Sequence, residues 1–324
     1  MLSYSIAIRT LGTSGDMFRE ELLSIAAQTV QPERVMIYIA EGYARPAFSV
    51  GREEYVWVKK GMVAQRSLPC DDISSDVIFL LDDDVRLAPD SAERMLKAME
   101  VHDVDGIGAD TFKNQNMSVA KKIYAAVTNL VFPHYSDRWA FKVHKTGSFS
   151  YNNRPTRSLY LSQSCAGNAM MLRRSVYESL HFEDERWLDE LPFAYGDDMV
   201  ESYKIFKNGY RLGVVYDSGC EHLDAGSASS ALRRGVEWMH TRAMSSFIIW
   251  WRIIYEPARK GSFDRLSALF CFAAKSAWVF LIMCAVSVMK LSPRYAVMHL
   301  RGLRDGRRFV RSDKFRALNP YILR

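Results

Sequence analysis

The sequence predicts an α/β fold built on a mostly parallel sheet with helices on both faces. Strand-like and helix-like segments alternate through the first hundred residues, the order that repeated strand–helix units produce. Residues 76–81 are almost wholly apolar, as a parallel strand covered on both faces is. The chain has 324 residues, 48% of them hydrophobic and 25% charged, so it can bury a large core, and a disordered or low-complexity protein is excluded.

In the first 105 residues, short runs of β-branched, aromatic and aliphatic residues predict strands over 4–8, 34–39, 55–58 and 76–81. Apolar residues at helical spacing predict a helix over 18–28. A short helix is expected over 61–68. Pro89 and Asp90 introduce another over 91–101.

The second half is less regular. Aromatic and basic residues are interleaved from 111 to 164 without a lasting period, so an irregular second lobe is expected there. Regular structure is predicted again as a strand over 166–172, a helix over 199–207 and a strand over 211–216. Asn208 and Gly209 end the helix, since glycine is common just after a helix C-terminus.

Acidic residues follow two of the predicted strands. Glu41 comes after strand 34–39, and Asp82, Asp83 and Asp84 come after strand 76–81. Ligands of open parallel sheets bind outside the carboxyl ends of the strands, so one site is predicted there. Adjacent carboxylates repel one another unless a cation is shared, and Mg²⁺ or Mn²⁺ prefers oxygen ligands. The alternative is a solvated acidic turn before a helix.

An acidic pair and a histidine each have two interpretations. Asp197 and Asp198 stand at the start of helix 199–207, either as catalytic groups or as residues favoured there by capping and by the helix dipole. His222 follows the last predicted strand, either as a metal ligand or as a structural histidine.

The order of these motifs resembles that of family-2 inverting glycosyltransferases with the GT-A fold, over about residues 3–230. The resemblance rests on IAIRT at 6–10, EG at 41–42, GMVAQR at 61–66, LDDD at 81–84, GNAMMLRR at 167–174, GDDMVESY at 196–203 and NGYR at 208–211. It implies a GT-A domain over 1–230, with a nucleotide-sugar half over 1–105 and an acceptor half over 106–230.

The resemblance implies a metal site and a nucleotide site. Asp82 and Asp84 match the outer aspartates of the family's D-x-D motif, so Asp84 would hold Mn²⁺ or Mg²⁺ against the donor diphosphate, while Asp82 would contact the ribose or the metal. His222 matches a late histidine near that metal. The nucleotide would contact Asp83, Thr10, Glu41 and Arg66.

Each of the last three matched positions has its own implied role. Thr10 lines the base pocket through its backbone. Glu41 replaces the aspartate that usually binds the base, for which uracil and thymine are the common partners. Arg66 would lie near the nucleotide, the alternative being an ion pair with an acid such as Asp71. In the acceptor half, Asp198 matches the general base that acts on the acceptor hydroxyl, and Asp197 would support it.

Residues 231–324 form a separate, strongly basic region. They contain 18 basic and 5 acidic residues, a net charge of +13, whereas the rest of the chain has −7. Residues 266–289 carry Lys275 as their only charge, and tryptophans and arginines flank them. We expect helices that lie in or dip into the cytoplasmic leaflet of the inner (plasma) membrane, on anionic lipid, as a peripheral or monotopic protein. The alternative is a core helix packed on the body.

The resemblance implies a metal-dependent transfer of sugar from a UDP- or dTDP-sugar to a hydroxyl of a glycan or lipid-linked acceptor, in cell-surface polysaccharide synthesis. One alternative is an inactive, membrane-associated scaffold of the same fold. A nucleotidyltransferase is a weaker alternative, because residues 12–15 lack the lysine of a phosphate-binding loop. A nucleic-acid partner is not expected, because the body of the protein is acidic.

Overall fold

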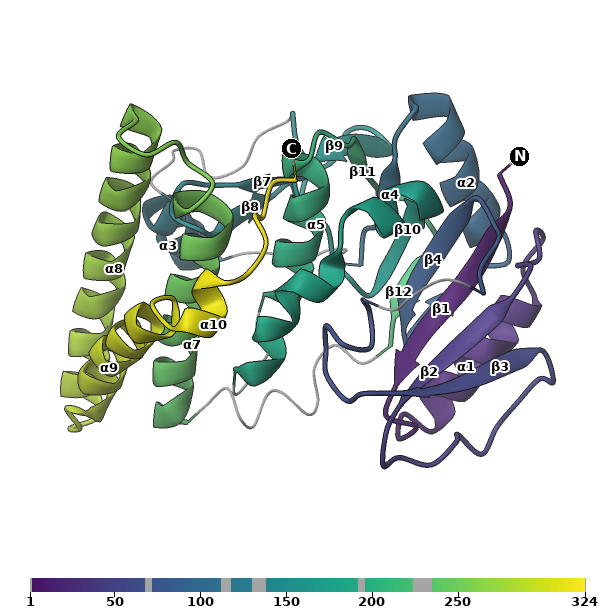
Figure 1. Ribbon diagram of the computed structural model, residues 1–324, viewed down its shortest axis with the longest axis horizontal. Coiled ribbons are helices and arrows are strands. Elements are labelled where there is room, and N and C mark those ends of the chain that lie inside the picture. Colours follow the sequence, from purple (N-terminus) through teal and green to yellow (C-terminus); the bar gives the residue numbers. More distant parts are fainter. Residues whose placement is uncertain are drawn as a thin grey trace.

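The computed structural model describes residues 2–67, 72–111, 118–129, 138–191, 196–223 and 235–323. Its centre is an eight-stranded sheet in the order β3-β2-β1-β4-β10-β6-β11-β9 (Figure 1). One half of this sheet is formed by parallel strands: β1 (Tyr4–Thr10), β2 (Val35–Ala40), β3 (Glu53–Val58) and β4 (Val77–Asp82).

The other half of the sheet mixes directions. β10 (Ala169–Arg173) runs antiparallel to both of its neighbours, β4 and β6 (Gly106–Ala109). β11 (Leu212–Val215) is parallel to β6, and β9 (Leu159–Ser162) closes the edge in the antiparallel direction. The sheet is therefore mostly parallel, which confirms the predicted fold class and is consistent with GT-A architecture.

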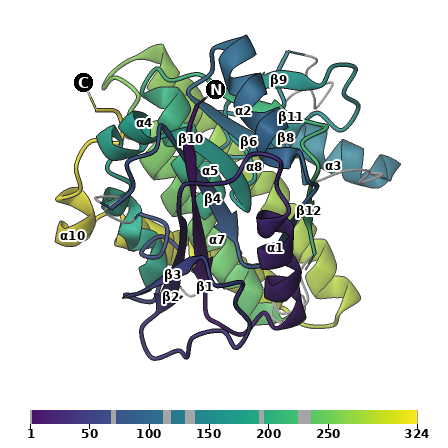
Figure 2. The same ribbon diagram turned by 90° about the vertical axis from the view of Figure 1, so that its right-hand side faces the viewer.

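Helices cover both faces of the sheet because the parallel strands are apolar on both faces. Along β4, Phe79 packs with residues of α1 (Asp16–Ala26) and α2 (Ser91–His102) on one face. The next residue, Leu80, packs with residues of α4 (Arg174–Ser179) and α5 (Asp197–Lys207) on the other. Figure 2 shows α1 and α4 on opposite sides of β1 and β4.

Two segments differ from the sequence predictions. The described part of 61–68 is a hydrogen-bonded turn and not a helix, because the backbone N–H groups of Val63 and Ala64 donate to the Asp189 carboxylate at 3.0 and 2.9 Å. Residues 111–164 are more regular than expected. Their described parts form α3 (Val119–Asn129), a hairpin of β7 (Phe141–Val143) and β8 (Phe149–Tyr151), and the sheet strand β9.

A small second sheet brings a late segment beside the three aspartates. β5 (Val85–Leu87) directly follows Asp84 and pairs with β12 (Cys220–His222), with His222 opposite Val85. The backbone N–H of Leu223 donates to the Asp84 carbonyl at 2.8 Å. This pairing places His222 next to the acidic turn.

Buried ion pairs connect the basic region to the rest of the protein. It comprises α7 (Val236–Trp250), the π-helical η2 (Trp251–Tyr255), α8 (Phe263–Met289), α9 (Arg294–Phe309) and α10 (Asp313–Arg316). The fully buried Arg252 donates to Glu185 of the 3₁₀ helix η1 (Phe182–Glu190) at 2.8 Å, and Lys204 of α5 donates to the same carboxylate at 3.1 Å. The helices α7, α8 and α9 lie together at one end of the molecule, away from β1–β3 (Figure 1).

α8 has an exposed face and a face that packs on neighbouring elements. Among the described residues it is the one helix long and apolar enough to cross a membrane. Phe272 anchors it by stacking on Trp250 at 4.2 Å between ring centroids. Apart from Ala268 and Phe272 its residues are not buried, and Phe270 and Leu281 are 71% and 62% exposed. α8 is therefore not a buried core helix.

Candidate functional site

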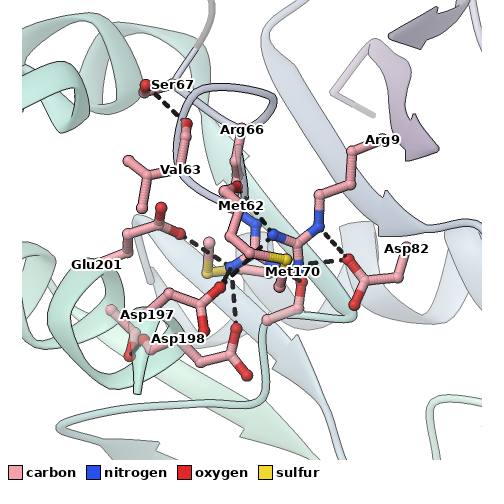
Figure 3. A network of polar contacts seen from close by, with 12 residues as sticks. Arg9, Met62, Val63, Arg66, Ser67, Asp82, Met170, Asp197, Asp198 and Glu201 are labelled. Carbon is pink, nitrogen blue, oxygen red and sulfur yellow. Dashed lines mark hydrogen bonds and ion pairs between the residues drawn. The ribbon is translucent and has the colours of Figure 1, made fainter. Parts of the chain in front are cut away.

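One buried arginine joins the acidic residues of the two halves of the protein (Figure 3). Arg66, on the turn held by Asp189, has a side chain only 4% exposed. Its Nη1 lies 2.9 Å from Asp198 Oδ1 and 3.0 Å from Glu201 Oε2, and its Nη2 lies 3.3 Å from Asp82 Oδ1. A buried cation requires such partners, since an unpaired one is costly. The alternative partner Asp71 lies outside the described residues.

A second arginine approaches the same carboxylates from β1. Arg9 donates from Nε to Asp82 Oδ1 at 2.5 Å, and its Nη1 lies 3.5 Å from Asp197 Oδ2. Burial acts to raise the pKa of Asp82, but the positive charges of Arg9 and Arg66 outweigh it, so the pKa is lowered. Asp82 is thus an anion held by two arginines.

The acidic residues of α5 occupy different environments although they share a helix face. Burial, together with the negative charge of Asp198, raises the pKa of Asp197 to about 6 despite Arg66 and Arg9. Burial raises the pKa of Glu201 to about 7, more than the neighbouring Arg66 lowers it. Asp198 differs from both because its side chain is 44% exposed and lines a large cavity. It is therefore the carboxylate of this group most accessible to a second molecule.

Gly167 leaves the space that this arrangement needs. A Cβ atom there would lie 2.0 Å from Asp198 Oδ1 and 2.6 Å from Arg66 Nη1. The Gly167 carbonyl also accepts from Arg66 Nη2 at 3.1 Å. Position 167 thus cannot carry a side chain without displacing the Arg66–Asp198 pair.

The remaining aspartates point to two different sets of partners. Thr10 Oγ1 donates to Asp83 Oδ2, and the backbone N–H of Gly12 donates to Thr10 Oγ1 at 2.7 Å. His222 Nε2 lies 3.0 Å from Asp84 Oδ2, while Asp84 Oδ1 is buried without a hydrogen-bond partner. Asp83 therefore orders the loop after β1, and Asp84 and His222 form a separate pair.

Asp84 and His222 fit a divalent cation as two protein ligands. An unpartnered buried carboxylate oxygen beside an imidazole nitrogen is a donor set that Mn²⁺ accepts, and the remaining positions suit phosphate oxygens and water. Asp82 faces the two arginines instead. No group of three or more His, Cys, Asp or Glu side chains in the described part of the chain is arranged to hold a metal. A metal here would thus depend on ligands brought by the substrate.

A buried glutamate lies beneath the acidic turn. Glu21 of α1 is fully buried, and its carboxylate has no side-chain hydrogen-bond partner among the described residues. Burial, reinforced by the negative charges of Asp83, Asp84 and Asp82, raises its pKa well above the usual value. The buried position thus disfavours the ionised form of Glu21.

Glu41 is separate from this cluster. It is exposed just after β2, where its backbone N–H donates to the Val58 carbonyl at 2.8 Å. Glu41 is not among the described residues that line the cavity. The structure thus brings together Thr10, Arg66, Asp82, Asp83, Asp84, Asp197 and Asp198, with His222 beside Asp84.

The cavity beside these residues has a volume of about 1400 Å³. Arg9, Asp82–Asp84, Asp197 and Asp198 line one part of it. Residues of α3, α7, α8 and α9 line another part, including Tyr124, Arg242, Lys275, Met283 and His299. Pockets for one small ligand usually measure 300–1,000 Å³, so this cavity has room for two.

The sequence predictions did not include four residues of the site: Arg9, Glu201, Asp189 and Glu21. Arg9 carried a signal, since a charge inside an otherwise apolar strand requires a partner. Glu201 carried another, because it stands three positions after Asp198 and therefore shares its helix face. Asp189 and Glu21 act through contacts with residues far away in the sequence, and no local pattern marks them.

The chain matches a known protein family. The sequence model described as glycosyl transferase family group 2 matches residues 77–303, from the start of β4 into α9. No curated protein matches the chain. The match covers more than half of the chain and includes the acidic turn, Gly167, Asp198 and the cavity-lining helices. The chain therefore belongs to glycosyl transferase family group 2.

Proposed function

We propose that the protein is a metal-dependent, inverting transferase that moves a sugar from a nucleotide diphosphate, with a UDP- or dTDP-sugar favoured, to a hydroxyl of a glycan or lipid-linked acceptor. The observation that carries the proposal is that Asp82 and Asp198, from the two halves of the protein, pair with the same buried Arg66 and line one cavity. Glycosyl transfer needs such a junction, because the attacking hydroxyl and the leaving diphosphate must be held on opposite sides of one carbon.

On the donor side, Asp84 and His222 would hold Mn²⁺ or Mg²⁺. The metal would supply positive charge to the diphosphate as it leaves. Thr10 and Asp83 order the loop after β1 on the cavity wall, which supports a role for this loop in holding the nucleotide. Asp82 would act through Arg9 and Arg66, which it fixes in place, rather than as a direct metal ligand.

On the acceptor side, Asp198 would be the general base. It would take the proton of the acceptor hydroxyl as that oxygen attacks the anomeric carbon and the nucleotide diphosphate departs from the other face. Arg66 orients the Asp198 carboxylate through Oδ1. Asp197 is buried and paired with both arginines, so it would position its neighbour rather than receive the proton.

The exposed apolar surface of α8 and the positive charge of α9 support association with a membrane. Amphipathic and apolar helices next to basic residues bind anionic lipid surfaces. Nucleotide sugars are cytoplasmic, so we place the protein at the cytoplasmic face of the inner membrane. An acceptor attached to lipid, used in the synthesis of a cell-surface polysaccharide, would then reach the cavity from the membrane side.

A donor screen tests this function. The full-length protein is incubated with UDP-, dTDP- and GDP-sugars, Mn²⁺ and a lipid extract, and release of each nucleoside diphosphate is measured. One donor should be consumed by the wild-type protein, and Asp198→Asn should lower the rate by about 100-fold or more. The matched change Asp189→Asn is not suitable, since Asp189 holds the Arg66 turn; Asp103→Asn on the surface serves as control. Equal rates for wild type and Asp198→Asn would exclude Asp198 as the base.

A further inference from the structure

Three basic side chains from three different helices line the cavity. Arg242 comes from α7, Lys275 from α8 and His299 from α9, and all three line the cavity. The positive charge of Arg242 acts to lower the pKa of Lys275 and of His299, and that of Lys275 acts in the same direction on His299. Three different helices therefore each contribute one basic group to the wall of this cavity.

No carboxylate within the described ranges pairs with this basic cluster. Lys275 Nζ donates to the Thr146 carbonyl and to Ser246 Oγ, both at 3.1 Å, and both are uncharged acceptors. The nearest acid on α9, Asp305, pairs with His240 at 2.9 Å. Like charges in a partly apolar cavity are unfavourable unless an anion joins them.

His299 adds an independent observation. The His299 residue is only 6% exposed, and its Nε2 atom has no hydrogen-bond partner. Burial and the positive charges of Arg242 and Lys275 lower the pKa of the imidazole more than its hydrogen bond with the Ser276 backbone raises it. A buried polar atom without a partner, on the wall of a cavity, is a place where a ligand atom is expected.

The walls near this basic cluster are apolar. Val279 and Met283 of α8 and Leu303 of α9 line the cavity there. The same cavity continues to Asp198. One molecule that occupied it would therefore meet an apolar wall, a positive cluster and the acceptor-side carboxylate.

From this arrangement we propose that Arg242, Lys275 and His299 bind a phosphate group of the acceptor, and that an apolar chain attached to that phosphate lies along Val279, Met283 and Leu303. The proposal rests on the proposed function, and it narrows the acceptor to a lipid phosphate or diphosphate. The cation cluster would hold the phosphate by charge-assisted hydrogen bonds. The rest of the acceptor would then reach Asp198.

The test compares binding of four probes to the full-length protein in neutral detergent: farnesyl phosphate, farnesol, inorganic phosphate and UDP with Mn²⁺. The test variant is Arg242→Gln, whose side chain is exposed to the cavity, so it should fold. His299→Gln is the second variant. Arg307→Gln is the control, because Arg307 is an exposed arginine of α9 that does not line the cavity.

Wild type and Arg307→Gln should bind farnesyl phosphate alike, whereas Arg242→Gln and His299→Gln should bind it about tenfold more weakly or worse, the loss expected for one charged hydrogen bond. Farnesol should bind weakly to all four proteins. Unchanged farnesyl phosphate binding in both test variants would overturn the proposal. Inorganic phosphate that binds as tightly as farnesyl phosphate would overturn the lipid part.

Binding of UDP with Mn²⁺ separates this proposal from the proposed function. It should be unchanged in Arg242→Gln, because the basic cluster is not part of the donor site. If UDP binds but the affinity for farnesyl phosphate is the same in all variants, the acceptor proposal fails and the transferase function stands. If neither UDP nor dTDP binds to the wild type in the presence of Mn²⁺, the proposed function itself fails.

Discussion

Arg66 and Asp198, 132 positions apart in the sequence, form an ion pair with 2.9 Å between Nη1 and Oδ1. The pair links the turn over residues 61–67 to the first turn of α5. Because Arg66 is buried and also contacts Asp82 and Glu201, moving any one of these carboxylates disturbs the others.

Replacement of Arg66 by methionine should strongly destabilise the fold. The change leaves Glu201 buried without its cation and Asp197 with Arg9 alone, and an unpaired buried charge costs about 3 kcal/mol or more. Urea unfolding at pH 8 measures the loss. The control is Arg34→Met, which breaks a surface pair with Glu54 and a hydrogen bond to the Asp72 carbonyl, and should cost about 1 kcal/mol. Equal losses in the two variants would show that the Arg66 pairs contribute no more than surface ones.

Substitution of Gly167 by alanine should impair transfer more than binding of the donor. The new Cβ would displace the Arg66–Asp198 pair, and a misplacement of about 1 Å in a reacting group costs about 100-fold in rate. Gly213→Ala is the matched control, because a Cβ there meets Leu159 at an ordinary 3.5 Å. Transfer rates and UDP affinities of both variants are measured side by side. A Gly167→Ala protein as active as Gly213→Ala would contradict the packing argument.

Glu201 should make stability depend on pH in a defined direction. Its pKa in the folded protein is about 7, above the usual 4.5, so its contribution is fully present below pH 4.5 and is lost as pH rises through 7. The unfolding free energy of wild type relative to Glu201→Gln should therefore fall between pH 5 and pH 8, by on the order of 1 kcal/mol.

Glu54→Gln is the control for this pH series. The pKa of Glu54 is lowered by its hydrogen bond with Arg34, so Glu54 stays ionised across pH 5–8. The difference between wild type and Glu54→Gln should thus be constant over this range. A constant difference for Glu201→Gln as well would mean that Glu201 does not titrate near neutrality.

Negative charges on the exposed face of α8 should release the protein from membranes. Phe270→Glu and Leu281→Glu place carboxylates where apolar side chains are 71% and 62% exposed. Flotation with vesicles of anionic phospholipid should show bound wild type and unbound double variant. Val101→Glu, at an exposed apolar position of α2, is the control and should stay bound. Vesicle binding by the double variant would place the lipid-binding surface elsewhere.

Deletion of the C-terminal region is a less informative test of membrane binding. Tyr321 is 2% exposed, and its hydroxyl donates to the Val200 carbonyl of α5 at 2.6 Å. Arg252 likewise pairs with the buried Glu185. A truncated protein would lose core contacts, so point changes on α8 distinguish membrane contact from folding.

The parallel half of the sheet could be predicted from the sequence because its physical cause is local. Strands buried on both faces must be apolar throughout, and β4 shows this in consecutive residues. The direction of β10 could not be predicted in this way, because a strand of apolar residues fits either direction and its pairing partners, β4 and β6, lie far away in the sequence. The turn over residues 61–67 was missed for a similar reason, since its stabilising carboxylate, Asp189, is more than a hundred residues away.

The same distinction between local and long-range causes applies to the candidate site. Asp82–Asp84 and Asp198 stood out because acidic residues at strand ends and helix starts have a local signature. The separation of Asp82 from Asp84 had none, since it depends on Arg9 and on the pairing of β12 with β5. The order of the motifs along the chain was enough to indicate the family. The ion pairs of Arg66, in contrast, are seen only in the folded chain.

The central claim is that Asp84 belongs to a metal-dependent donor site and Asp198 to the acceptor side of the same cavity. Calorimetric titration with UDP, dTDP, GDP and CDP, with and without Mn²⁺, tests it most directly on wild type, Asp84→Ala and Asp198→Asn. One diphosphate should bind wild type and Asp198→Asn with similar affinity only when Mn²⁺ is present, and Asp84→Ala should not bind it. Binding that needs no metal, binding that survives in Asp84→Ala, or no binding of any diphosphate to the wild type would contradict the account.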